Sequence, residues 1–170
     1  MRNLEPMSVS LIGFMASGKS TVGVLLAEAL GVPFVDLDER IEQREGASVS
    51  MIFEQRGESG FRAAERAALL SVLDGPPAVL ACGGGTPCQP GAMHALGRWG
   101  QTVFLQVPLD RLRERTAADP NERPLWDEDV ARRYMERLPV YRAADWIVDG
   151  TQPRTAVVGA ILKALEVGVE

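Results

Sequence analysis

Cysteine and histidine are scarce in this sequence. Only two cysteines, Cys82 and Cys88, and one histidine, His94, occur among its 170 residues. Two cysteines are too few for a disulfide framework or a zinc site, and a single histidine excludes a histidine-rich metal cluster. We expect His94 to lie on a surface helix, and we assign it no role.

Positive charge and long apolar runs are also lacking. Lysine and arginine number 18 against 23 acidic residues, which gives a net charge of −5. This balance argues against nucleic acid and anionic membranes as partners. No apolar run reaches the ~18 residues that span a bilayer. The apolar stretch 9–16 follows no cluster of positive charges, so we interpret it as a buried strand rather than a signal peptide and expect a cytoplasmic protein.

Segments typical of strands and of helices alternate along the chain. Apolar, β-branched runs predict strands at 8–14, 32–38, 76–85, 101–107 and 146–150. Helical patterns occupy 18–31, 38–46, 48–57, 58–74, 90–97, 108–118, 127–138, 139–145 and 154–166. The alternation predicts an α/β fold, with a parallel sheet covered by helices on both faces and a single domain over 1–170.

A phosphate-binding motif follows the first predicted strand. Gly13, Gly18, Lys19 and Ser20 fit the spacing G-x-x-x-x-G-K-[ST] and open a helix. The glycines let backbone N–H groups cradle phosphate oxygens, Lys19 would reach the β- and γ-phosphates, and Ser20 would offer its hydroxyl to Mg²⁺. GTPase switches share this loop, but the sequence lacks their N-K-x-D motif and a D-x-x-G motif after the third predicted strand. Both absences make a GTPase switch a less favoured hypothesis.

Two acids end the second predicted strand. Asp36 and Asp38 alternate in "DLD", and on a strand such residues point to the same side, here toward the phosphate loop. One would help to hold the metal ion, and the other would accept a hydrogen bond from an acceptor hydroxyl and help to remove its proton. The alternative is that Asp38 caps a helix and Asp36 is only an acid at the edge of the sheet.

Two arginines and a glycine run are candidates for an acceptor site. Arg62 lies beside an aromatic residue in "GFRAAER", and Arg137 precedes a proline in "RLPVYR". An arginine fork binds a carboxylate in a bidentate way, although each arginine alone could equally be a solvated surface residue. The run Gly83–Gly85 would allow a ring to pack against the main chain, or would simply be a flexible turn.

The order "GxxxxGKST … DLD … IFEQRGESGFRAAE … GGGTP … RPLW … RLPVYRAAD" resembles the shikimate kinase family from about residue 9 to 165. The resemblance implies a P-loop NTPase fold, a three-layer αβα sandwich with a five-stranded parallel sheet. It also implies substrate-binding helices over about 37–64, a short lid over about 115–127, and a monomer. The implied reaction is phosphorylation of the 3-hydroxyl of shikimate by ATP with Mg²⁺, a step toward chorismate and the aromatic amino acids.

The resemblance also assigns roles to individual residues. Asp38 would bind the ring hydroxyls as the candidate base, and Arg123 would close over the phosphates from the lid. Asp36 would support Mg²⁺ together with Ser20. The implied shikimate contacts besides Asp38 are Arg62, Gly83, Gly84, Gly85 and Arg137. The implied ATP contacts are Ala16, Ser17, Gly18, Lys19, Ser20, Thr21, Arg115, Arg123 and Pro153, with Arg115 and Pro153 near the adenine.

Two alternatives stay open on the sequence alone. A kinase for another small hydroxy acid, such as gluconate, would also need an anion clamp, so the two arginines only partly discriminate. A nucleotide-binding regulatory module without acceptor chemistry would share the phosphate loop. Stimulation of ATP consumption by a small hydroxy acid would separate these classes.

Overall fold

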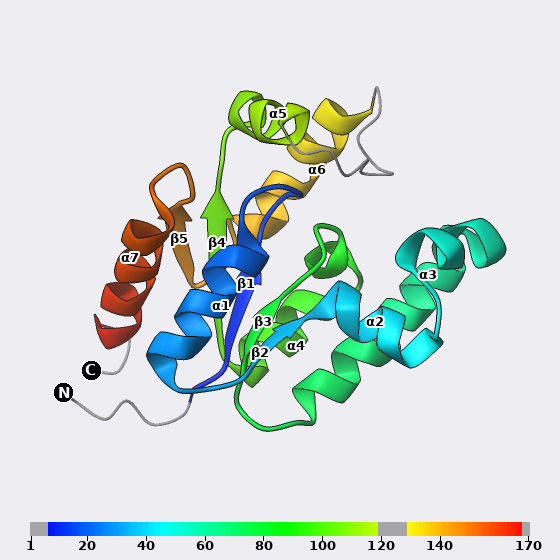
Figure 1. Cartoon of the computed structure of the whole chain (residues 1–170), viewed down its shortest axis with the longest axis horizontal. Helices are drawn as coiled ribbons and strands as arrows, with labels where there is room; N and C mark the ends of the chain where they lie inside the picture. Colours follow the sequence, from blue (N-terminus) through cyan, green and yellow to red (C-terminus); the bar gives the residue numbers. More distant parts are fainter. Residues whose placement is uncertain (1–6, 119–128, 168–170) are drawn as a thin grey trace.

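Five parallel strands form one sheet in the computed structural model, which describes residues 7–118 and 129–167. The strands are β1 (Val9–Ile12), β2 (Phe34–Asp36), β3 (Val79–Ala81), β4 (Gln101–Gln106) and β5 (Trp146–Asp149), in the order β2-β3-β1-β4-β5 (Figure 1). Every pair of neighbouring strands is parallel. The predicted five-stranded α/β fold is therefore confirmed.

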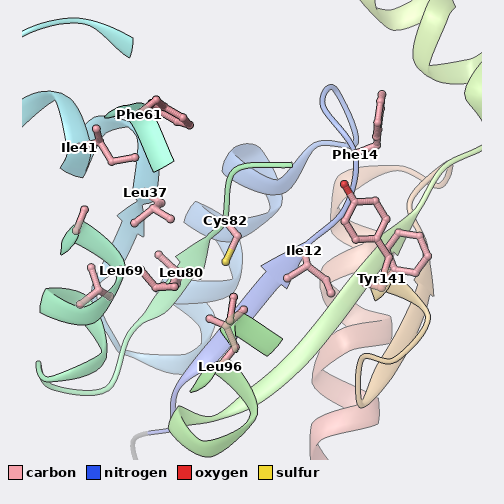
Figure 2. Close-up of a cluster of buried hydrophobic side chains, with 14 of the residues drawn as sticks. Ile12, Phe14, Leu37, Ile41, Phe61, Leu69, Leu80, Cys82, Leu96 and Tyr141 are labelled. Carbon is pink, nitrogen blue, oxygen red and sulfur yellow. The ribbon is translucent and has the colours of Figure 1, made fainter. Parts of the chain in front are cut away.

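Helices cover both faces of this sheet. They are α1 (Lys19–Leu30), α2 (Leu37–Glu45), α3 (Val49–Leu73), α4 (Ala92–Trp99), α5 (Leu109–Ala117), α6 (Val130–Tyr141) and α7 (Arg154–Val167), with a 3₁₀ turn at Thr86–Cys88. Alternate residues of β1 separate two cores, because successive strand side chains point to opposite faces. Leu11 packs in a cluster with α1 and α7, whereas Ile12 packs in the other with helices that include α3, α4 and α6 (Figure 2).

The strand order places β1 between β3 and β4. The chain leaves β1 through α1 toward β2 on one side, whereas β4 lies on the other side. Crossovers that leave in opposite directions open a crevice beyond the carboxyl ends of the strands, where α/β proteins bind ligands. The segment that follows β1 at this edge is the phosphate loop.

The second strand is shorter than predicted. It ends at Asp36, and α2 begins at Leu37, so the prediction that Asp36 and Asp38 share one face of a strand is wrong. Asp36 itself caps α2: its Oδ1 accepts hydrogen bonds from the N–H groups of Asp38 at 3.0 Å and Glu39 at 3.4 Å. An aspartate that can satisfy the first turn favours a helix start over continued strand. The capping alternative named the wrong residue.

Other boundaries also differ from the prediction in detail. The two helical segments at 48–57 and 58–74 are joined as α3, but Gly57 has φ 67° and ψ −172°, which interrupts the helix between them. The third strand ends at Ala81, ahead of the glycine run. The segments 127–138 and 139–145, predicted as helical, contribute to a single helix, α6, over Val130–Tyr141, whereas residues 127 and 128 lie outside the described residues.

Part of the predicted lid lies outside the described residues. Arg115 belongs to α5, whereas residues 119–128, with Arg123, are not described. Within the described ranges, no helix is long and apolar enough to cross a membrane.

Candidate active site

The phosphate loop between β1 and α1 adopts a conformation that depends on left-handed backbone. Gly13 has φ 150°, Ala16 has φ 63° and Gly18 has φ 97°. A methyl group at Gly13 would lie 2.9 Å from the carbonyl oxygen of Leu105, so the loop packs tightly on β4. Gly18 is the N-cap of α1 and offers no side chain to its first turn. The N–H groups of this turn suit an anion, which the helix dipole also favours.

Lys19 folds back over this loop. Its Nζ donates hydrogen bonds to the carbonyl oxygens of Gly13 and Phe14, each at 2.9 Å, and a longer one to Ser17 Oγ at 3.4 Å. These bonds hold the ammonium group at the mouth of the anion site.

Ser20 and Asp36 meet at the start of α1 and the end of β2. Ser20 Oγ donates a hydrogen bond to Asp36 Oδ2 at 2.5 Å, while the other carboxylate oxygen caps α2. Hydroxyl and carboxylate oxygens are ligands that suit Mg²⁺, which usually keeps waters and phosphate oxygens in its remaining positions. In the ranges 7–118 and 129–167 no group of three or more His, Cys, Asp or Glu could hold a metal. The Ser20 hydroxyl and the Asp36 carboxylate are oxygen ligands of the kind that fits Mg²⁺.

Asp38 reaches the same space from the first turn of α2. The residue stays exposed, yet the protein around its carboxyl group removes enough water to raise the pKa of Asp38 to about 6. The negative charge of Asp36 raises this pKa further, and the positive charge of Lys19 opposes both effects. Asp38 is thus ionised at neutral pH, but it is a stronger base than an ordinary aspartate.

A cavity of about 510 Å³ joins these groups. Its walls come from the phosphate loop, α1, the β2–α2 junction and the segment after β3, and include Lys19, Ser20, Asp36, Asp38, Cys82, Gly83 and Gly84. The prediction that the candidate site residues after the first three strands lie together is confirmed for these residues. Burial raises the pKa of the Cys82 thiol to about 12, so this wall residue is a neutral thiol rather than a nucleophile.

Each glycine of the run Gly83–Gly85 faces a different candidate acceptor residue. A methyl group at Gly83 would lie 3.4 Å from Asp38 Oδ1, and one at Gly84 would lie 3.1 Å from Arg137 Nη1. A methyl group at Gly85 would collide with the guanidinium group of Arg62. The glycines thus make room for the protein's own charged side chains, and the structure brings Asp38, Arg62 and Arg137 around one short segment.

Arg62 is held from below by an acid that the sequence interpretation did not single out. Its Nη1 donates to Glu65 Oε1 at 2.8 Å, and Glu65 Oε2 accepts a hydrogen bond from Thr86 Oγ1 at 2.6 Å. Glu65 is 2% exposed, so its charge is stabilised by these two partners. The helical spacing of three residues between Arg62 and Glu65 was the available signal. No signal in the sequence pointed to the contact between Glu65 and Thr86.

Both arginines also pack on aromatic rings. The Arg62 guanidinium lies 5.2 Å from the centre of the Phe61 ring, and that of Arg137 lies 5.5 Å from the centre of the Phe14 ring. Such contacts stabilise a guanidinium group by about 0.5–1 kcal/mol where it is solvated, and by more where it is not. The rings limit the positions open to both forks.

A second cavity, of about 610 Å³, lies on the other side of the phosphate loop. Arg115 and Pro153, the two residues expected near adenine, both line it, together with Ala16, Ser17, Gly18 and Thr21. Arg115 donates to the carbonyl oxygens of Ala16 and Ser17, each at 3.2 Å, and to that of Gly150 at 2.7 Å. It therefore links the phosphate loop to the β5–α7 connection.

Arg154 was missed by the sequence interpretation. It follows Pro153 at the start of α7 and lines both cavities. Its sequence context is a plain helix start, which gave no reason to choose it among the other arginines.

Comparison with known proteins identifies the family. The sequence model of the shikimate kinase family matches residues 15–166. A shikimate kinase of Aquifex aeolicus is 40% identical over 163 residues, which cover 94% of this chain and 96% of the relative. Its crystal structure matches with a TM-score of 0.87 over 96% of this chain and 98% of that chain.

Two further solved structures frame this match. A shikimate kinase from Acinetobacter baumannii in complex with shikimate is 33% identical, with a TM-score of 0.87 over 95% of this chain and 94% of that chain. A gluconokinase from Sinorhizobium meliloti is 24% identical, with a TM-score of 0.65 over 95% of this chain and 92% of that chain, and shows the fold alone. On the family match and the identity to the Aquifex aeolicus relative, the chain belongs to the shikimate kinase family.

Proposed function

We propose that this protein transfers the γ-phosphoryl group of ATP to the 3-hydroxyl of shikimate, giving shikimate 3-phosphate and ADP on the route to chorismate. Membership of the family makes the protein an ATP-dependent shikimate kinase. The roles given to its residues rest on one observation: a single cavity joins the phosphate loop, Asp38 and the glycine run that both arginines approach.

The nucleotide would occupy the larger cavity and the phosphate loop. The adenine would lie between Arg115 and Pro153, and the phosphates would follow the backbone of residues 16–21 into the smaller cavity. Lys19 Nζ would exchange its bonds to the carbonyls of Gly13 and Phe14 for phosphate oxygens. Arg123 would add a positive charge from the lid, a role that rests on the family resemblance.

Ser20 and Asp36 would hold Mg²⁺ with the phosphates, and the ion would neutralise phosphate charge there. Asp36 stays anchored by the cap of α2, so it can leave Ser20 without losing its position. Both side chains would then help to orient the phosphates of ATP, the phosphoryl donor.

Asp38 would orient the attacking hydroxyl and take its proton. A pKa of about 6 keeps the carboxylate ionised at neutral pH and lies close enough to the operating pH for a general base. Phosphoryl transfer needs little further covalent chemistry, since positioning and charge neutralisation supply most of the rate.

Arg62 and Arg137 would bind the carboxylate of shikimate. Both guanidinium groups lie against the glycine run, and each is restrained by a neighbouring ring. Arg62 remains partly paired with Glu65, so Arg137 would contribute the larger share of uncompensated positive charge.

A coupled assay that offers shikimate, gluconate and a nucleoside monophosphate separately tests this function. We expect ADP to form when shikimate is the acceptor, and not when gluconate or a nucleoside monophosphate is offered. Turnover with gluconate instead would favour the hydroxy-acid alternative, and no stimulation by any acceptor would favour a regulatory module.

A further inference from the structure

The backbone of the glycine run is fixed at its middle residue by a side chain from a distant helix. Tyr141, at the end of α6, is completely buried, and its hydroxyl donates a hydrogen bond to the carbonyl oxygen of Gly84 at 2.5 Å. Its ring packs 5.2 Å from that of Phe104, inside the larger apolar cluster (Figure 2). The packing leaves the hydroxyl as the polar end of an otherwise apolar anchor.

The carbonyls of the other two glycines accept hydrogen bonds from the backbone of nearby residues, and that of Gly85 also accepts a longer one from Gln89 Nε2 at 3.3 Å. The carbonyl oxygen of Gly83 accepts the N–H of Thr86 at 3.1 Å, and that of Gly85 accepts the N–H of Cys88, also at 3.1 Å. Gly84 is thus the member of the run whose carbonyl is held by Tyr141. Because glycine has wide conformational freedom, three in succession would otherwise sample many peptide orientations.

Tyr141 and Arg137 approach Gly84 together. They are four residues apart on α6, so their side chains leave the same face of the helix one turn apart. Arg137 Nη1 would lie 3.1 Å from a methyl group at Gly84. Burial raises the pKa of the Tyr141 hydroxyl, and the positive charge of Arg137 lowers this pKa only in part, so the hydroxyl is a neutral donor.

We propose that the Tyr141 hydroxyl is a positioning residue for the acceptor site. The Tyr141 hydroxyl fixes the orientation of the peptide that follows Gly84. Because Arg137 lies beside Gly84, this bond also fixes the position at which Arg137 meets the carboxylate of the acceptor. The proposal rests on the proposed function for the identity of the acceptor. It assigns Tyr141 no contact with the substrate.

The two tyrosines of the chain provide a matched experiment. Tyr134 also lies on α6, is 9% exposed, and donates its hydroxyl to a backbone carbonyl, that of Val107 at 3.0 Å. Tyr134→Phe and Tyr141→Phe each remove one buried hydroxyl bonded to main chain, but only the second bond reaches the glycine run. Tyr134→Phe therefore controls for the structural cost of the deletion.

We expect Tyr141→Phe to raise the KM for shikimate by roughly five- to tenfold, the loss of one hydrogen bond, with the KM for ATP unchanged. Tyr134→Phe should leave both values near those of the wild type. Thermal unfolding of the two variants should shift by similar amounts. A KM for shikimate that is equal in the two variants would overturn the proposal.

Amide hydrogen exchange of residues 83–86 in the ligand-free protein gives a readout that needs no turnover. Exchange should be faster in Tyr141→Phe than in Tyr134→Phe, and equal rates would also overturn the proposal. If wild-type protein fails to phosphorylate shikimate, the proposed function fails. The exchange comparison still decides whether Tyr141 orders the glycine run.

Discussion

Asp36 and Asp38 are two residues apart but experience different surroundings. The carboxylate oxygens of Asp36 accept hydrogen bonds from the first turn of α2 and from Ser20, whereas Asp38 lines the cavity and has a raised pKa. Local hydrogen bonds therefore separate a metal-binding candidate from a proton acceptor.

We expect Asp38→Asn to lower kcat by at least a hundredfold, as the loss of a general base does, while the affinity for ATP stays unchanged. Steady-state kinetics with shikimate and calorimetric titration with ATP would measure both. Glu39→Gln, at the exposed neighbour, is the control for a lost charge in the first turn of α2. Loss of ATP binding in Asp38→Asn would place this residue at the nucleotide instead.

The pKa of Asp38 also predicts how activity and stability depend on pH. As pH falls through about 6, Asp38 becomes protonated, so kcat/KM for shikimate should fall about tenfold per pH unit. The folded pKa is above the ordinary value of 3.8, so ionised Asp38 destabilises the fold above pH 6 and this cost vanishes below 3.8. Asp38→Asn should therefore raise the unfolding temperature at pH 7 but not near pH 3.5. A flat activity profile down to pH 5 would contradict this assignment.

The glycines of the segment after β3 leave space for charged side chains from α2, α3 and α6. At Gly85 the obstructing atoms are the far end of the Arg62 side chain rather than backbone. Gly85 has φ −90° and ψ −11°, which alanine adopts without strain. A substitution there displaces the arginine rather than the fold.

Gly85→Ala should therefore raise the KM for shikimate by about tenfold or more and leave the affinity for ATP intact, because the carboxylate loses one of its forks. Gly97→Ala is the matched control, since nothing lies within 4 Å of a methyl group there. In α4 that change should slightly stabilise the protein and leave both KM values alone. An unaltered KM in Gly85→Ala would argue against a carboxylate at Arg62.

The sequence predicted elements and motifs better than it predicted contacts. The alternating apolar segments were enough for the parallel sheet, and the spacing of Gly13, Gly18 and Lys19 was enough for the phosphate loop. The start of α2 was misplaced because Asp36 can end a strand or cap a helix with equal local plausibility. The Glu65–Thr86 bond joins residues 21 positions apart, so no local pattern could reveal it.

Ligand binding should stabilise the entire fold against unfolding. ATP with Mg²⁺ at a hundred times its Kd adds about 2.7 kcal/mol to the free energy of unfolding, provided the unfolded chain does not bind it. We expect the unfolding temperature to rise by several degrees in a thermal scan. Lys19→Ala should lose most of this ligand-induced shift and abolish turnover.

Lys163→Ala, at the other lysine of the chain, is the control. This residue lies on the exposed side of α7 and should keep the full shift and normal turnover. Normal kcat in Lys19→Ala would contradict the assignment of the phosphate loop.

The two cavities have part of their lining in common: Ala16, Gly18, Thr21, Arg115 and Arg154 border both. A molecule bound in one cavity therefore contacts residues that a molecule in the other cavity also contacts. By thermodynamic linkage, any factor by which shikimate alters the affinity for ATP must equal the factor by which ATP alters the affinity for shikimate. Titrating each in the presence and absence of the other would reveal whether this common lining is rigid or adaptable.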